Sequence, residues 1–89
     1  MSKYRKRSLV IDAFRYVALE LALETDWFRY AYEHGLARNG SDGLTLETLE
    51  GAMYVIPGDW IIKGIKGELY PIRNDIFIAS YDEVRDSAE

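Results

Sequence analysis

The chain has 89 residues, 48% of them hydrophobic, and carries a formal net charge of −4 at pH 7. A chain of this length forms one domain, which we expect to span residues 1–84 and to be followed by a frayed acidic tail at 85–89. The absence of cysteine excludes a disulfide framework, a thiolate nucleophile and a sulfur-ligated zinc site. Because the sequence has neither a run of about 18 apolar residues nor a signal-peptide pattern, we expect a cytosolic protein with no membrane partner.

The first predicted element is a strand over residues 4–16, in which an apolar face alternates with a mixed one. The apolar face consists of Leu9, Ile11 and Ala13. A basic group stands at the start of this strand, formed by Lys3, Arg5, Lys6 and Arg7. We interpret these charges as solvated residues that protect an edge strand from pairing. Nucleic-acid binding is the alternative, but the negative charge of the rest of the chain disfavours it.

Residues 17–24 (VALELALE) fit two structures, because their alternation suits a strand whereas Ala, Leu and Glu favour a helix. An amphipathic helix is predicted over residues 26–34, between a capping Thr25 or Asp26 and a terminating Gly35. Its apolar stripe is expected to contain Trp27, Tyr30, Ala31 and His34. The single histidine ends this helix, where a cation favours the helix dipole, and we expect it to cap the helix rather than bind a metal.

Residues 39–43 (NGSDG) are turn formers and are expected to be the least ordered stretch. Four short strands are predicted after them, at 44–49, 52–56, 60–64 and 68–72. Glycine-containing turns join these strands into an antiparallel meander, which curls easily into a half-barrel. A structural turn at Pro57, Gly58 and Asp59 is part of this pattern, with the Asp59 carboxylate bonding to backbone N–H groups of its own turn. With a short C-terminal helix at 75–81, the predicted fold class is α+β.

Residues 48–81 (TLEGAMYVIPGDWIIKGIKGELYPIRNDIFIASY) combine a TLEG element, PGDW followed by I-I-x-G, G-E-x-Y-P, and D-I-F before a closing Tyr. This combination resembles small uncharacterised phage and prophage proteins that carry a PGDW or PGDY turn. Residues 4–14 (YRKRSLVIDAF) are similar to their YRKKPVVIEAF opening, and the Trp27-Phe28 pair matches their helix. Ser8 stands where proline is common in them, and Ile72 where cysteine is frequent. The resemblance covers most of the chain and implies a shared fold and a phage or prophage gene, but no activity.

Catalytic motifs are absent from the sequence. It contains no G-x-S-x-G elbow and no G-x-G-x-x-G or Walker-type loop, and residues 64–67 (GIKG) are too short to wrap a phosphate. Glu68 and Asp75 are the candidates for an acid–base pair, but no spacing ties them together. We therefore predict that the protein is not an enzyme and uses no metal or cofactor.

The aromatic residues of the meander are the remaining site candidates. Tyr54, Trp60 and Tyr70 lie on different predicted strands, where they either pack in the core or form an exposed stacking platform. In the second interpretation, nearby cations contact an anionic ligand: Lys63, Lys66 and Arg73.

Two classes of function follow from these observations. The leading hypothesis is a non-catalytic phage accessory protein in the bacterial host cytosol. It would inhibit a host defence by binding a host protein or a nucleotide-like signal. The alternative is a structural or assembly protein that forms homo-oligomers or decorates a phage component, since self-association stabilises a small domain.

Overall fold

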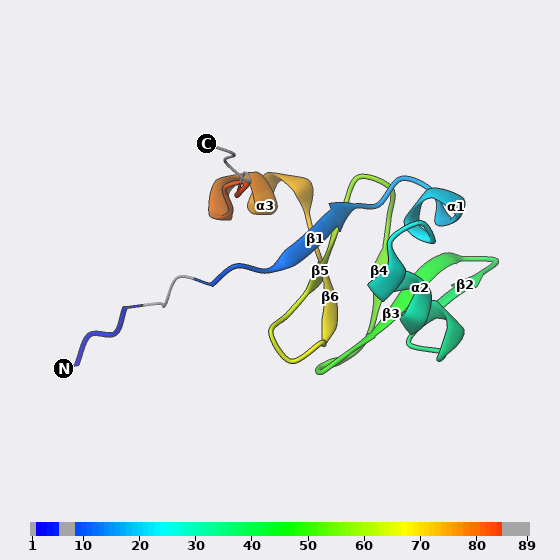
Figure 1. Ribbon diagram of the computed structural model, residues 1–89, viewed down its shortest axis with the longest axis horizontal. Coiled ribbons are helices and arrows are strands. Elements are labelled where there is room, and N and C mark those ends of the chain that lie inside the picture. The colour runs from blue at the N-terminus through cyan, green and yellow to red at the C-terminus, as the bar shows by residue number, and fades with distance from the viewer. Residues whose placement is uncertain (1, 6–8, 85–89) are drawn as a thin grey trace.

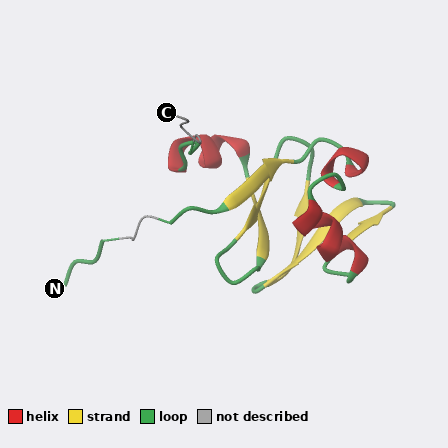
Figure 2. Ribbon diagram, viewed as in Figure 1, coloured by secondary structure: helices red, strands yellow, loops and turns green. Residues whose placement is uncertain are grey.

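The computed structural model describes residues 2–5 and 9–84. Across these residues the fold is α+β, with strands in the middle of the molecule and helices at its margins (Figures 1 and 2). The elements in chain order are β1 (Asp12–Arg15), α1 (Leu19–Ala22), α2 (Asp26–Glu33), β2 (Ala37–Gly40), β3 (Gly43–Thr48), β4 (Gly51–Val55), β5 (Trp60–Lys63), β6 (Leu69–Ile72) and α3 (Asn74–Ser80). Within this part of the chain, no helix is long and apolar enough to cross a membrane.

The strands form two antiparallel sheets, ordered β1-β5-β6 and β2-β3-β4. In Figure 1, α1 and α2 lie beside the second sheet, whereas α3 lies at the other end of the molecule, above β1. The core forms where the inward faces of the sheets and α2 meet, because each of these faces is apolar. Its buried side chains include Phe28 and Ala31 from α2, Leu44 and Leu46 from β3, and Ile61 and Leu69 from the first sheet.

The turn at Pro57, Gly58 and Asp59 separates the two sheets. The Asp59 N–H donates to the Ile56 carbonyl (3.0 Å), and the Asp59 carboxylate accepts from the Ile56 N–H (3.2 Å). Gly58 has φ +103°, which glycine adopts without a steric penalty. The turn then bonds to the chain after β1, since the Gly58 N–H donates to the Tyr16 carbonyl and the Tyr16 N–H donates to the Asp59 carbonyl, both at 2.8 Å.

The predicted four-stranded meander is not confirmed. β4 and β5 do not pair, so the four predicted strands are two hairpins that belong to different sheets. The first hairpin is extended by β2, which directly precedes β3 in the chain, and the second by β1, which is distant in sequence. The half-barrel curl is not confirmed.

The N-terminal strand is shorter than the predicted 4–16. Regular pairing runs only from Asp12, opposite Lys63, to Arg15, opposite Trp60. Residues 9–11 have no strand partner because the chain leaves β5 after Lys63 and enters the turn to β6. Residues 6–8 of the predicted strand, like the predicted tail at 85–89, lie outside the described residues.

Of the two structures considered for residues 17–24, the helix is present, as the four-residue α1. In α2 the predicted apolar stripe was partly wrong. Phe28 and Ala31 are the buried residues of the helix, whereas Tyr30 and His34 stack on each other outside the core, with ring centroids 3.9 Å apart. Burying Phe28 places a fully apolar side chain in the core, whereas Tyr30 and His34 each carry a polar group that water can solvate. His34 ends the helix as expected, and its Nδ1 donates to the Tyr30 carbonyl at 2.8 Å.

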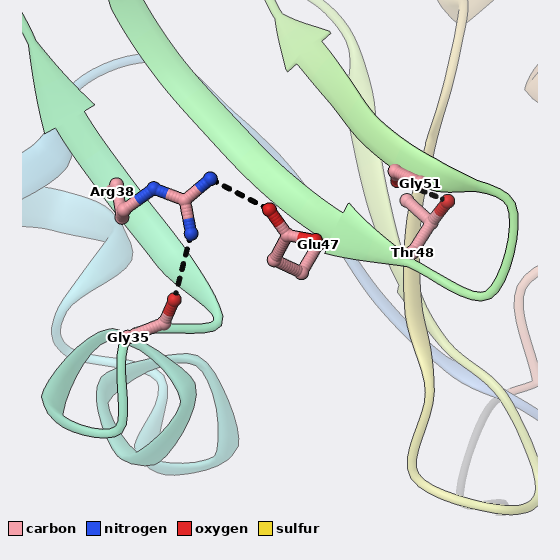
Figure 3. Close-up of polar contacts among 5 residues, drawn as sticks. All are labelled: Gly35, Arg38, Glu47, Thr48 and Gly51. Atoms are coloured by element: carbon pink, nitrogen blue, oxygen red, sulfur yellow. Dashed lines mark hydrogen bonds and ion pairs between the residues drawn. The ribbon is translucent and has the colours of Figure 1, made fainter.

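Residues 39–43, predicted to be the least ordered stretch, form the tip of the β2–β3 hairpin, in which Gly40 pairs with Gly43. Figure 3 shows how β2 is tied to its surroundings: Arg38 donates to the Gly35 carbonyl (3.1 Å) and to the Glu47 carboxylate on β3 (2.6 Å). The same view shows Thr48 donating to the Gly51 carbonyl (2.7 Å) across the β3–β4 turn. The Arg38–Glu47 ion pair is exposed, so it contributes little stability and mainly supports the register.

Candidate functional site

The first sheet has an inner and an outer face, and the strand register decides which residues share each one. Side chains alternate between the faces along a strand, and directly opposed residues lie on the same face. Ile61 faces the core, so its neighbours Trp60 and Ile62 lie on the outer face. Tyr70, opposite Ile62, and Ile72, opposite Trp60, share that outer face.

Helix α3 covers part of this outer face through a row of aromatic rings. The Trp60 indole is stacked on Phe77, with ring centroids 3.9 Å apart and an angle of 8° between the planes. Phe77 in turn stacks on Tyr81, one helical turn later, at 4.9 Å and 22°. The Trp60 Nε1–H donates to the Asn74 side-chain carbonyl at 2.8 Å. Trp60 therefore anchors α3 by a ring stack and a hydrogen bond at the start of the helix.

A groove of about 510 Å³ opens beside this row of rings, and we call it the α3 groove. We call the stacked rings of Trp60, Phe77 and Tyr81 its floor, and the other lining residues, 9–13 and 82–84, its walls. Three acidic residues line it, Asp12, Asp82 and Glu83, and the Asp12 carboxylate is paired with Lys63, whose Nζ lies 3.7 Å away. No lysine, arginine or histidine among the described residues lines it. The α3 groove thus combines an aromatic floor with an acidic rim.

The wall that precedes β1 is apolar and exposed. Leu9 is 53% exposed and Val10 is 78% exposed, although both side chains are apolar. They lead into β1, which is an outer strand of its sheet, and no strand of the described chain pairs with its other edge. An unpaired edge presents backbone N–H and C=O groups to which another extended segment can bond.

The structure separates the six residues that the sequence suggested for a single site. Trp60 lies in the α3 groove and Tyr70 lies beside it on the same face. Burial raises the pKa of the Tyr70 phenol, and the nearby Tyr81 and Glu68 raise it further. Tyr54 is exposed on β4, in the other sheet.

The three predicted cations also lie outside the α3 groove. Lys63 is on the inner face of the first sheet, with its Nζ 3.7 Å from the Asp12 carboxylate and 6.0 Å from the centre of the Trp27 ring. Lys66 lies in the β5–β6 turn, and Arg73 precedes α3. Arg73 pairs with Asp75 at 2.7 Å, and this hydrogen bond holds the pKa of the Asp75 carboxyl below its usual value. The cations therefore do not gather around Trp60.

Glu68 and Asp75, the two candidates for acid–base chemistry, serve separate local structures. The Glu68 carboxylate accepts from the Lys66 N–H (2.9 Å) in the β5–β6 turn, whereas Asp75 is held by Arg73. Glu68 and Tyr70 also border a second hollow of about 370 Å³, together with Met53 and the β3–β4 turn. In the described ranges, no three His, Asp or Glu side chains lie close enough to hold a metal ion.

Several residues of the α3 groove were not foreseen from the sequence. Phe77 and Tyr81 stand four residues apart in the predicted C-terminal helix, and this spacing places them on one helical face. That signal was available, but the partner of this face was not, because Trp60 lies 17 positions earlier than Phe77 in the sequence. The roles of Asp82 and Glu83 likewise depend on residues 9–13 lying opposite them.

Comparisons of the chain with known protein families, with curated proteins and with solved structures found no match.

Proposed function

We propose that this chain is a non-catalytic phage or prophage accessory protein that binds a host protein in the bacterial cytosol and thereby inhibits a host defence. The phage setting rests on the sequence pattern of residues 48–81. The binding role rests on one observation, the α3 groove with its aromatic floor and acidic rim.

The shape and lining of the groove support recognition of a protein segment. The rings of Trp60, Phe77 and Tyr81 are partly exposed, and aromatic side chains of this kind supply a large contact area with little loss of side-chain entropy and often dominate the energy of protein interfaces. The volume of about 510 Å³ suits a few side chains of a partner. Leu9 and Val10 extend the apolar surface beyond the floor.

The charge of the groove favours a basic protein segment over a nucleotide. Asp82 and Glu83 would repel the phosphates of a nucleotide at short range, and no Lys, Arg or His of residues 2–5 and 9–84 lines the groove to offset this repulsion. A segment that carries Lys or Arg beside an apolar or aromatic residue would place its cation against the acidic rim and pack its apolar side chain on the aromatic floor. Of the two ligand classes that the sequence suggested, we therefore favour a host protein.

Pull-down from host lysate tests this proposal with two charge-matched variants. Asp82→Lys/Glu83→Lys reverses the charge of the rim, and both positions lie outside any helix or strand. Glu24→Lys/Glu33→Lys makes the same change in net charge at exposed positions remote from the groove. We expect a host protein to be captured by the original chain and by the control, and to be lost from the rim variant. Equal capture by all three, or capture by none, would overturn the proposal.

A titration with nucleotides provides the second arm of the test. Trp60 lies in the floor, so a ligand in the α3 groove changes tryptophan fluorescence. We expect no saturable change with nucleotides. A saturable change that the rim variant strengthens would instead identify an anionic ligand and reject the host-protein assignment.

A further inference from the structure

Residues 2–5, at the N-terminal end of the described chain, are exposed along their whole length. This segment is extended and leads away from the two sheets, as the blue trace in Figure 1 shows. Tyr4 is 94% exposed and stands between Lys3 and Arg5. A tyrosine in this position leaves nearly all of its apolar ring in water, which favours association with another surface.

The α3 groove has the complementary chemistry. Its rings Trp60, Phe77 and Tyr81 match an aromatic side chain, and its carboxylates match the two cations that flank Tyr4. Residues 2–5 are not part of the lining of the groove in their own chain, and in Figure 1 they lie away from α3 and the two sheets. A second copy of the chain, in contrast, can present the segment from outside.

We propose that residues 2–5 of one copy dock in the α3 groove of a second copy, and that the two copies exchange these segments reciprocally. Tyr4 packs against the ring row of Trp60, Phe77 and Tyr81, while Lys3 and Arg5 face the acidic rim of Asp82 and Glu83. Reciprocal exchange closes the assembly as a symmetric dimer, in which every contact occurs twice. The exposed Leu9 and Val10 beside the unpaired edge of β1 are then covered as the two N-terminal segments pass each other.

This inference uses the groove of the proposed function but does not require a host partner. A basic and aromatic host segment and the N-terminal segment of a second copy would compete for one surface. Self-association of the purified protein and capture of a host protein are separate measurements, so either proposal can fail alone. If the protein dimerises but captures no host protein, the segment exchange stands and the proposed function fails. If the protein is a strict monomer that captures a host protein through the groove, the proposed function stands and the segment exchange fails.

Sedimentation velocity of the full chain over a range of concentrations tests the exchange. Lys3→Glu/Arg5→Glu reverses the charge of the segment, and Asp82→Lys/Glu83→Lys reverses that of the rim. We expect each variant to weaken dimerisation by about tenfold or more, and the chain that combines both sets to recover it, because the charges then match again. All four substituted positions are exposed and lie outside helices and strands, so we expect the substitutions to leave the fold of the domain unchanged.

Tyr4→Ala tests the aromatic contact, with Tyr54→Ala as the control at another exposed tyrosine. We expect the first variant to be mainly monomeric and to leave Trp60 more accessible to acrylamide, and the second to dimerise as the original chain does. Monomers of the original chain at millimolar concentration would overturn the inference. So would a dimer that Tyr4→Ala leaves intact, or a combined charge reversal that fails to restore dimerisation.

Discussion

At the residue scale, a single carboxylate organises the β5–β6 turn. Glu68 accepts the Lys66 N–H (2.9 Å), while its backbone carbonyl accepts the Gly64 N–H (2.8 Å). The carboxylate lies directly over Gly64, where any side chain would overlap it. Gly64 thus leaves room for this carboxylate and is not needed for an unusual backbone angle, since its φ is not in the positive range.

We therefore expect Gly64→Ala to displace the Glu68 side chain and break its bond to Lys66, lowering the free energy of unfolding by about 1 kcal/mol. Urea denaturation measures the change. Gly40→Ala is the matched control, because a Cβ at Gly40 meets no atom within 4 Å. Equal effects of the two substitutions would contradict this role of Glu68.

Tyr70 makes the free energy of unfolding depend on pH in the alkaline range. Its pKa is raised from the ordinary 10.0, first by burial and then by Tyr81 and Glu68, so the folded state favours the neutral phenol. The stabilisation is fully present below pH 10 and is lost as the pH rises through the raised pKa. We expect Tyr70→Phe to lose less stability above pH 10 than the original chain, as measured by urea denaturation at several pH values. Tyr54→Phe, at an exposed position, should retain the original profile.

At the element scale, the helices differ in how firmly they are held. Helix α2 places Phe28 and Ala31 in the core, whereas none of the residues of α3 is buried. Helix α3 depends on the Trp60–Phe77 stack and on the bond from Trp60 to Asn74. Elements with few buried contacts open locally at lower free energy, so α3 is expected to exchange its amide hydrogens faster than β3.

Phe77→Ala removes the ring that links Trp60 to Tyr81. In a Trp27→Phe background, Trp60 is the only tryptophan. We expect acrylamide to quench its fluorescence more strongly after Phe77→Ala. Ile78→Ala is the control, since Ile78 is on the same helix and 65% exposed. Unchanged quenching in Phe77→Ala would show that α3 is held by other contacts.

At the scale of the whole molecule, the turn at Pro57, Gly58 and Asp59 decides how the hairpins combine. Its bonds to Tyr16 join the chain after β1 to the start of β5, and thus position the first sheet against the rest. A chain of 89 residues has a small free energy of unfolding. A substitution that strains the turn between its two sheets therefore lowers the stability of the complete fold.

Gly58→Ala places a side chain at φ +103°, and the nearest atom to the new Cβ is Arg15 Nη2 at an ordinary 3.7 Å. The cost is therefore backbone strain, about 1–2 kcal/mol. In a domain of this size each kcal/mol corresponds to a fall in Tm of roughly 4–8 °C, which a calorimetric scan resolves. A Tm equal to that of Gly40→Ala would contradict the requirement for a positive φ.

The amino-acid sequence by itself was sufficient for the α+β class, for α2 and α3 within a residue or two, and for the positions of most turns. These features depend on neighbours in the chain: a capping residue, a Pro-Gly pair, or the period of the apolar side chains. The same local signals predicted a turn at residues 39–43, but they could not show that the flanking β2 pairs with β3.

Tertiary structure alone decided which strands pair and which side chains meet. β4 and β5 are adjacent in sequence yet belong to different sheets, and β5 pairs instead with β1, more than 40 residues earlier in the chain. The α3 groove has the same origin, since Trp60, Phe77 and residues 9–13 come from three distant parts of the chain. Local propensity cannot encode such contacts, because their free energy comes from burial against partners that the fold itself brings together.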